Sequence, residues 1–162
     1  MKLLKTIRFD GSDERVFDKA AEPGEWAVSG AFAFADRAPS SLTGKTRQAF
    51  ANGFLGVASF GRSTFASVAH ASAGEREEIE RLLAQHFVAG YGAPDLDAAL
   101  PAAREEVSFV EDLCRGVLIN TVFAVRRTWG ADGGIKEEFR TIAPPSGPPP
   151  HARIWTVTDD DA

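Results

Sequence analysis

The feature that most restricts the fold of this chain is a pair of long alternating segments near its carboxyl end. Segments 117–129 and 135–142 flank the glycine-rich segment 130–134, which indicates two antiparallel strands joined by a five-residue loop. The register that this loop imposes gives the following cross-strand pairs: Arg127 with Glu137, Arg126 with Glu138, Trp129 with Ile135 and Val125 with Phe139. Because a slip of one residue would move every side chain to the other face, the opposite charges predict this register.

Four further segments have the composition of strands: 3–9, 26–34, 54–60 and 63–70. The last two flank Gly61-Arg62. A two-residue loop that begins with glycine predicts a type II′ hairpin turn, because its first position requires positive φ.

Helices are predicted between these strands. Ser72 and Glu75 have the spacing of a capping box and precede an amphipathic segment, which predicts a helix over residues 73–89. Pro101 suits a first helical position and predicts a second helix over residues 101–115. A shorter helix is expected over 43–51. The resulting fold class is α+β: an antiparallel or mixed sheet of about five to seven strands with two main helices packed on one face.

The domain organisation follows from length and composition. A chain of 162 residues has the size of one domain, and residues 1–143 are expected to form it. Residues 144–151 contain five prolines and predict an extended linker. Residues 152–162 form a short strand-like segment with an acidic end. Within it, Ile154, Trp155 and Val157 are candidate partner-binding residues, which would dock on the sheet of their own chain or be offered as an added strand to another chain.

Charge and cysteine content exclude several classes of protein. The net charge of −5 argues against binding to nucleic acid or to an anionic membrane surface, since both require a positive field. The single cysteine, Cys114, rules out an internal disulfide framework. No apolar segment has the length of a membrane span or of a signal peptide. We therefore expect a cytoplasmic protein.

Small residues along the strands offer a candidate ligand groove. Residues 27, 29, 31 and 33 are Ala or Ser on one side of the second strand, and small residues recur at positions 56, 58, 67 and 69. Such a face admits either closely packed helices or a shallow groove. If a groove forms, His70 and Arg126 are the candidate ligand-binding residues at its rim.

No group of residues in the sequence predicts catalysis, a metal site or a cofactor. The histidines are scattered, and His70 would need to meet Cys114 or an acidic residue across the fold to form a nucleophile and base. Four carboxylates, Glu105, Glu106, Glu111 and Asp112, are expected on the solvated face of the second helix and would form an acid/base cluster only if they converged with other groups.

Three segments carry a resemblance to a known family. These segments are Trp26–Phe34, the predicted hairpin over 53–69, and Val117–Phe123. On them the chain resembles a family of short, uncharacterised alphaproteobacterial proteins of unknown function, over about residues 1–142. The genes of such proteins can lie near those for a lipoate-ligase-like protein and for formate dehydrogenase accessory factors. The resemblance carries no catalytic motif and implies at most an accessory role in the maturation of a redox enzyme.

Two hypotheses on function follow. The first is a non-enzymatic accessory protein that binds a protein partner or a second copy of itself. The second is a small-molecule-binding protein or small enzyme that uses the groove beside His70 or Arg126. A pocket near either residue would favour the second hypothesis.

Overall fold

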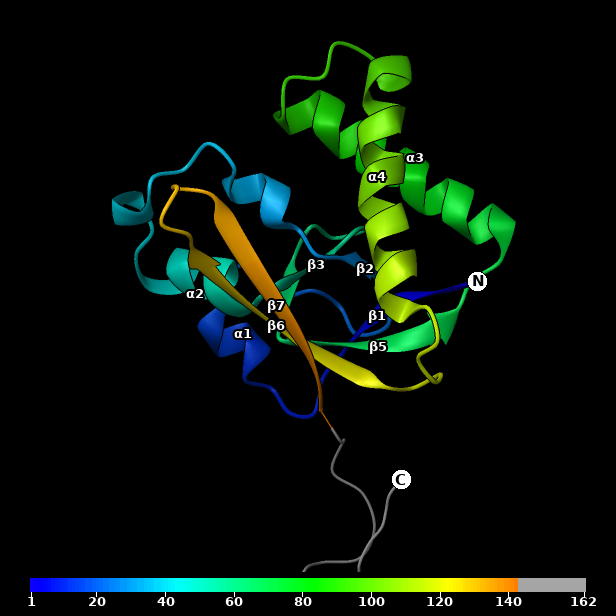
Figure 1. The fold of residues 1–162 in the computed structure, drawn as a ribbon, viewed down its shortest axis with the longest axis horizontal. Coiled ribbons are helices and arrows are strands. Elements are labelled where there is room, and N and C mark those ends of the chain that lie inside the picture. The colour runs from blue at the N-terminus through cyan, green and yellow to red at the C-terminus, as the bar shows by residue number, and fades with distance from the viewer. Residues whose placement is uncertain (143–162) are drawn as a thin grey trace, which may run out of the picture.

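The computed structural model describes residues 1–142, which form one seven-stranded antiparallel sheet with helices packed against it (Figure 1). The strand order is β4-β3-β2-β1-β5-β6-β7. The strands are β1 Lys2–Ile7, β2 Trp26–Val28, β3 Phe54–Gly56, β4 Arg62–Ser63, β5 Phe65–His70, β6 Val122–Trp129 and β7 Ile135–Ile142. The helices are α1 Asp13–Val16, α2 Gly44–Asn52, α3 Ala73–Gly90 and α4 Leu96–Cys114, with short 3₁₀ helices at Ala31–Phe34 and Pro39–Ser41.

This architecture confirms the predicted α+β fold, with seven strands at the upper end of the expected range. The predicted linker over 144–151 and the segment 152–162, with Ile154, Trp155 and Val157, lie outside the described residues. In Figure 1 the β6–β7 hairpin runs between α1 and α2 on its left and the pair α3 and α4 on its right.

The β6–β7 hairpin has the predicted register. Arg127 lies opposite Glu137, Arg126 opposite Glu138, Val125 opposite Phe139 and Trp129 opposite Ile135. The strand begins later than expected, at Val122. Before it, the chain forms a loop in which Asn120 adopts a positive φ of 72° and its N–H donates to the Val68 carbonyl at 2.8 Å.

The two main helices follow local capping signals, with one exception. In α3 the Ser72 hydroxyl accepts from the Glu75 N–H and the Glu75 carboxylate accepts from the Ser72 N–H, which confirms the capping box. The predicted start of the next helix at Pro101 is wrong. The Asp95 side chain caps α4 by accepting from the Ala98 N–H at 2.8 Å, and Pro101 lies inside the helix. Burial of the apolar side of α4 outweighs the hydrogen bond that proline removes.

Two predicted strands end early because of contacts with Arg62. The strand predicted over 26–34 stops at Val28, and Gly30 adopts a φ of +83° before the 3₁₀ helix. A Cβ atom on Gly30 would lie 2.6 Å from both Arg62 Nη1 and Leu55 Cβ. The predicted turn at Gly61-Arg62 is also wrong. Phe60 takes the positive φ of 61°, and Arg62 already pairs with Leu55 in the β3–β4 ladder.

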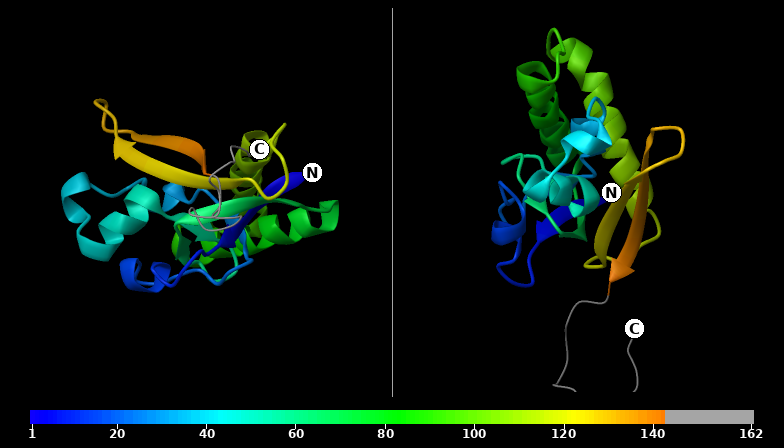
Figure 2. Two further views of the ribbon diagram at one scale, coloured as in Figure 1. Left: turned by 90° about the horizontal axis from the view of Figure 1, so that it is seen from below. Right: turned by 90° about the vertical axis from the view of Figure 1, so that its left-hand side faces the viewer.

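The sheet curls, and this curl positions the candidate site. β6 is separated from β2 by β1 and β5 in the strand order, yet the Phe139 ring on β7 lies 6.2 Å from that of Phe54 on β3. On its other side Phe139 lies 5.5 Å from Phe109 of α4. Figure 2 shows the hairpin at the rim of the molecule in both views. The β6–β7 hairpin therefore folds back toward β2 and β3 rather than continuing a flat sheet.

Gly61 is expected to tolerate no side chain. A Cβ atom there would lie 2.6 Å from the backbone carbonyl carbon and oxygen of Ala20, so Gly61→Ala should lower the free energy of unfolding by about 2 kcal/mol in urea denaturation. The matched control is Gly74→Ala in the first turn of α3, where the nearest atom is 4.0 Å away. It should raise stability by about 0.5 kcal/mol. Equal effects of the two substitutions would contradict the packing described for Gly61.

Candidate functional site

The candidate site is built around Arg127, whose side chain is completely buried. Alternation along β6 places Val125, Arg127 and Trp129 on the inner side of the hairpin, while Arg126 and Thr128 point to solvent. A guanidinium inside a protein requires a partner for each of its donors, because its charge cannot be removed at physiological pH.

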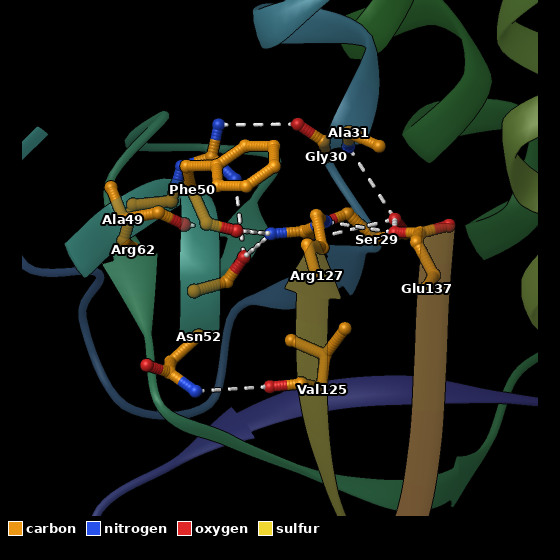
Figure 3. A network of polar contacts seen from close by, with 11 residues as sticks. Ser29, Gly30, Ala31, Ala49, Phe50, Asn52, Arg62, Val125, Arg127 and Glu137 are labelled. Atoms are coloured by element: carbon orange, nitrogen blue, oxygen red, sulfur yellow. Dashed lines mark hydrogen bonds and ion pairs between the residues drawn. The ribbon is translucent and has the colours of Figure 1, made fainter. Parts of the chain in front are cut away.

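The guanidinium of Arg127 joins parts of the chain that are distant in sequence (Figure 3). Its Nη1 donates to the Phe50 carbonyl at 2.9 Å and to the Gly53 carbonyl at 2.8 Å. Its Nη2 donates to the Ser29 carbonyl, and its Nε forms an ion pair with Glu137 at 2.8 Å. One side chain thus holds α2, the start of β3, the end of β2, and β7 together.

Two of these acceptors lie at the carboxyl end of α2. The last carbonyls of a helix have no partner within the helix and carry the negative end of its dipole. Arg127 supplies both a donor and a positive charge to Phe50, and its Nη1 also lies 3.5 Å from the Ala49 carbonyl. The Asn52 side chain adds a bond to the Val125 carbonyl at 3.4 Å. The end of α2 is therefore fixed against β6.

A second buried arginine lies beside the first. Arg62 donates to the Gly53 and Gly30 carbonyls, each at 3.2 Å, and its guanidinium lies 4.9 Å from the centre of the Phe34 ring. Within residues 1–142 it forms no ion pair with a carboxylate. Burial, together with the charge of Arg127, lowers the pKa of Arg62 to about 9, so the side chain is still positive at neutral pH. The two cations share the Gly53 carbonyl as an acceptor.

Carboxylates converge on the other side of Arg127. The Ser29 hydroxyl donates to the same Glu137 carboxylate that binds Arg127. Glu106 of α4 was expected to face water, and this expectation is wrong because the curl brings β7 beside α4. Burial and the charge of Glu137 raise the pKa of Glu106 to about 6, against a smaller opposite effect of Arg127. Glu111 also has a partner, the Arg76 guanidinium of α3.

Two adjoining cavities lie on the solvent side of this network, between α2 and β6. The first, of about 560 Å³, lies beside the side chains of Ser40, Leu42, Arg47, Phe50 and Trp129. The second, of about 510 Å³, lies beside Asn52, Thr64, Phe65, Arg126, Arg140 and Ile142. Both are also lined by Ala51, Arg127 and Thr128. We call the two cavities together the arginine groove.

The charges around the arginine groove have one sign. Arg47, Arg126 and Arg140 are exposed at its walls, and none of them forms an ion pair with another described residue. Among the described residues that line the groove there is no Asp, Glu, His or Cys. Hydroxyl and amide donors come from Ser40, Asn52, Thr64 and Thr128. The groove therefore offers positive charge and hydrogen-bond donors beside an apolar wall.

The two residues proposed from the sequence as ligand contacts lie apart. Arg126 lines the groove, whereas His70 is exposed at the far end of β5, five residues beyond Phe65 and hence about 17 Å along the strand. Cys114 is buried in the main core, and burial raises the pKa of its thiol to about 11. The thiol is therefore protonated at neutral pH, and no hydrogen bond within residues 1–142 joins it to His70.

Several residues of the site were missed in the sequence. Arg47 lies in a helix without a recognisable motif, and its place beside β6 depends on the curl. Arg127 carried a usable signal, since it shares its side of the strand with Val125 and Trp129.

Comparisons with known proteins complete the description of the site. A family model described as a family of unknown function, DUF6505, matches residues 1–149. No curated protein and no solved structure matches the chain. Within the described residues, no group of three or more His, Cys, Asp or Glu side chains could hold a metal ion, and no helix has the length and apolarity needed to cross a membrane.

Loss of the buried guanidinium should be severe. Arg127→Met keeps the volume but leaves Glu137 and three carbonyl oxygens without their donor, so the free energy of unfolding in urea should fall by about 3 kcal/mol or more. The neighbouring exposed residue gives the control, since Arg126→Ala should change it by less than about 0.5 kcal/mol. A similar loss in both variants would argue against the anchoring role of Arg127.

Glu106 should make stability depend on pH. Because its pKa in the folded protein is raised from 4.5 to about 6, the folded state holds the proton more tightly, and stability falls as the pH rises through this interval. Glu106→Gln should remove this slope and stabilise the protein above pH 6 by about 1 kcal/mol, a value reduced for partial solvent screening. Thermal unfolding from pH 4 to pH 8 measures the effect. The exposed neighbour variant Glu105→Gln should retain the slope, and its loss there would refute the assignment to Glu106.

Proposed function

We propose that this chain, which belongs to the DUF6505 family of unknown function, is a non-catalytic binding protein that holds a small anionic ligand in the arginine groove. The observation that carries the proposal is the set of three exposed arginines, Arg47, Arg126 and Arg140, around cavities that no described carboxylate lines. Arginine binds carboxylate and phosphate groups through paired, charge-assisted hydrogen bonds.

The size of the groove and the charge of the chain point to a small ligand. Each cavity falls within the volume range of small-molecule sites. The chain as a whole carries a net charge of −5, which repels long polyanions while leaving a local positive field intact. A compact anion is therefore favoured over nucleic acid.

The apolar side of the groove suggests what else the ligand carries. Leu42 and Phe50 line the first cavity, and the Phe50 ring is stacked with that of Trp129 at 4.8 Å. The arginines 126 and 140 line the second cavity. A ligand with an anionic group and an apolar or aromatic body would use both.

The inference that binding is not followed by chemistry rests on the type of side chain in the groove. The hydroxyls of Ser40, Thr64 and Thr128 lie among described lining residues that include no general base. Glu106 has a carboxyl group with a pKa near neutrality but lies by α4, away from these residues. A binding or carrier role follows more directly from this composition than a catalytic one.

The broader role stays a prediction from the sequence. An accessory function in the maturation of a redox enzyme, a cytoplasmic location and an alphaproteobacterial origin are compatible with an anion-binding protein. A protein that delivers or senses an anionic metabolite for a partner would unite the two hypotheses on function.

The proposal predicts selective binding of an anionic probe. The fluorescence of 8-anilinonaphthalene-1-sulfonate should rise on titration with the protein, and inorganic phosphate should compete with it. Arg126→Ala should weaken this binding about tenfold, since it removes one charge-assisted contact. Circular dichroism verifies that the variant is folded.

Two controls separate charge recognition from exposed apolar surface. N-phenyl-1-naphthylamine has a similar body without the sulfonate, and its affinity should be the same for the wild type and for Arg126→Ala. Arg81→Ala removes an exposed arginine of α3 far from the groove in sequence and should leave binding of the anionic probe unchanged. Equal loss of both probes, or equal effects of both substitutions, would overturn the proposal.

A further inference from the structure

The free edge of β7 is an unusual feature of the sheet. β7 has eight residues and is the last strand in the order, and the described residues place no strand on its other side. Long edges of this kind invite pairing with another chain, and most proteins shorten or cover them. β7 lies at the rim of the molecule in both views of Figure 2.

The backbone groups that point outward can be assigned from the ladder. The Gly130 N–H donates to the Gly134 carbonyl at 2.6 Å, so this pair is hydrogen-bonded. Hydrogen-bonded and non-hydrogen-bonded pairs alternate along an antiparallel ladder. The even-numbered residues of β7 therefore bond to β6. The backbone N–H and C=O groups that point away from β6 belong to Ile135, Glu137, Phe139 and Thr141.

We propose that this edge pairs with β7 of a second copy of the chain, antiparallel and about a two-fold axis at Phe139. In this register Glu138 lies opposite the partner's Arg140, and Arg140 opposite the partner's Glu138. Both side chains are exposed on the outer face, at a non-hydrogen-bonded pair where side chains come closest. The symmetry thus produces two ion pairs from one register.

Charge selects this register over its neighbours. Shifting the axis to Glu138 would place the two copies of Glu138 opposite each other and Lys136 opposite the partner's Arg140, which are like-charge pairs. Shifting it to Glu137 would pair the two copies of Glu137 and shorten the overlap to five residues. The axis at Phe139 gives no like-charge pair and joins residues 136–142 of both copies.

Apolar surface at the same place supports a second copy as the occupant. Phe139 packs against Phe109 of α4 on the inner face, and the Phe109 residue is 44% exposed. An axis at Phe139 would bring the two copies of this aromatic pair together and cover them. The polar pairing on one face and the apolar contact on the other therefore meet at the same axis.

The test is the oligomeric state of the full chain by sedimentation and light scattering over a range of concentrations. We expect a dimer whose dissociation constant rises about tenfold or more in Glu138→Arg and in Arg140→Glu, since each reversal creates two like-charge pairs. The double variant Glu138→Arg/Arg140→Glu should restore the dimer. Recovery in the double variant cannot come from general damage to the fold.

A second variant tests the edge without altering charge. Thr141→Pro removes an outward N–H and leaves the β6–β7 ladder intact, so it should also weaken the dimer. A dimer insensitive to Thr141→Pro would overturn the proposal, as would a monomer at all concentrations. A monomer whose β7 amides are protected from hydrogen exchange would overturn it too, because another segment of the same chain would then cover the edge.

Discussion

The buried guanidinium of Arg127 is the interaction on which the rest of the structure depends. Its donors reach carbonyls at the end of α2, before β3 and after β2, and its ion pair reaches β7. A buried cation tolerates few arrangements, because any donor that loses its acceptor costs desolvation energy that nothing returns. The curl of the sheet is therefore fixed by geometry rather than by apolar contact alone, since contacts such as that between Phe139 and Phe54 would permit sliding.

The same strand separates structure from recognition by alternation. Arg127 points inward and anchors α2, while Arg126 points outward into the groove that this anchoring creates. The groove exists because the end of α2 is held against β6 and leaves space on either side of Ala51. The buried arginines also place positive charge beneath its floor, which strengthens the local field for an anion in a chain of net charge −5.

Local signals in the sequence predicted what local interactions decide. The hairpin register followed from loop length and opposite charges, and α3 followed from its capping box. The failures all depend on contacts between distant segments: β2 ends where Gly30 meets Arg62, and Gly61 is needed against Ala20 rather than for a turn. At the site, Arg126 could be named from the sequence. The burial of Arg127 and Glu106 could not, because each depends on the curl. Yet a charged residue between Val125 and Trp129 on one strand face deserved to be interpreted as a buried ion pair.

Arg140 connects the groove with the free edge. It lines the second cavity, and in the proposed dimer it faces the partner's Glu138. A ligand that engages Arg140 would compete with that ion pair, and binding equilibria that share a group are reciprocally linked. Ligand binding would then weaken the dimer by the same factor by which dimerisation weakens ligand binding. Arg47 and Arg126, which the β7 edge does not use, would set the affinity that persists in the dimer. A binding protein built in this way reports occupancy of its groove through its oligomeric state.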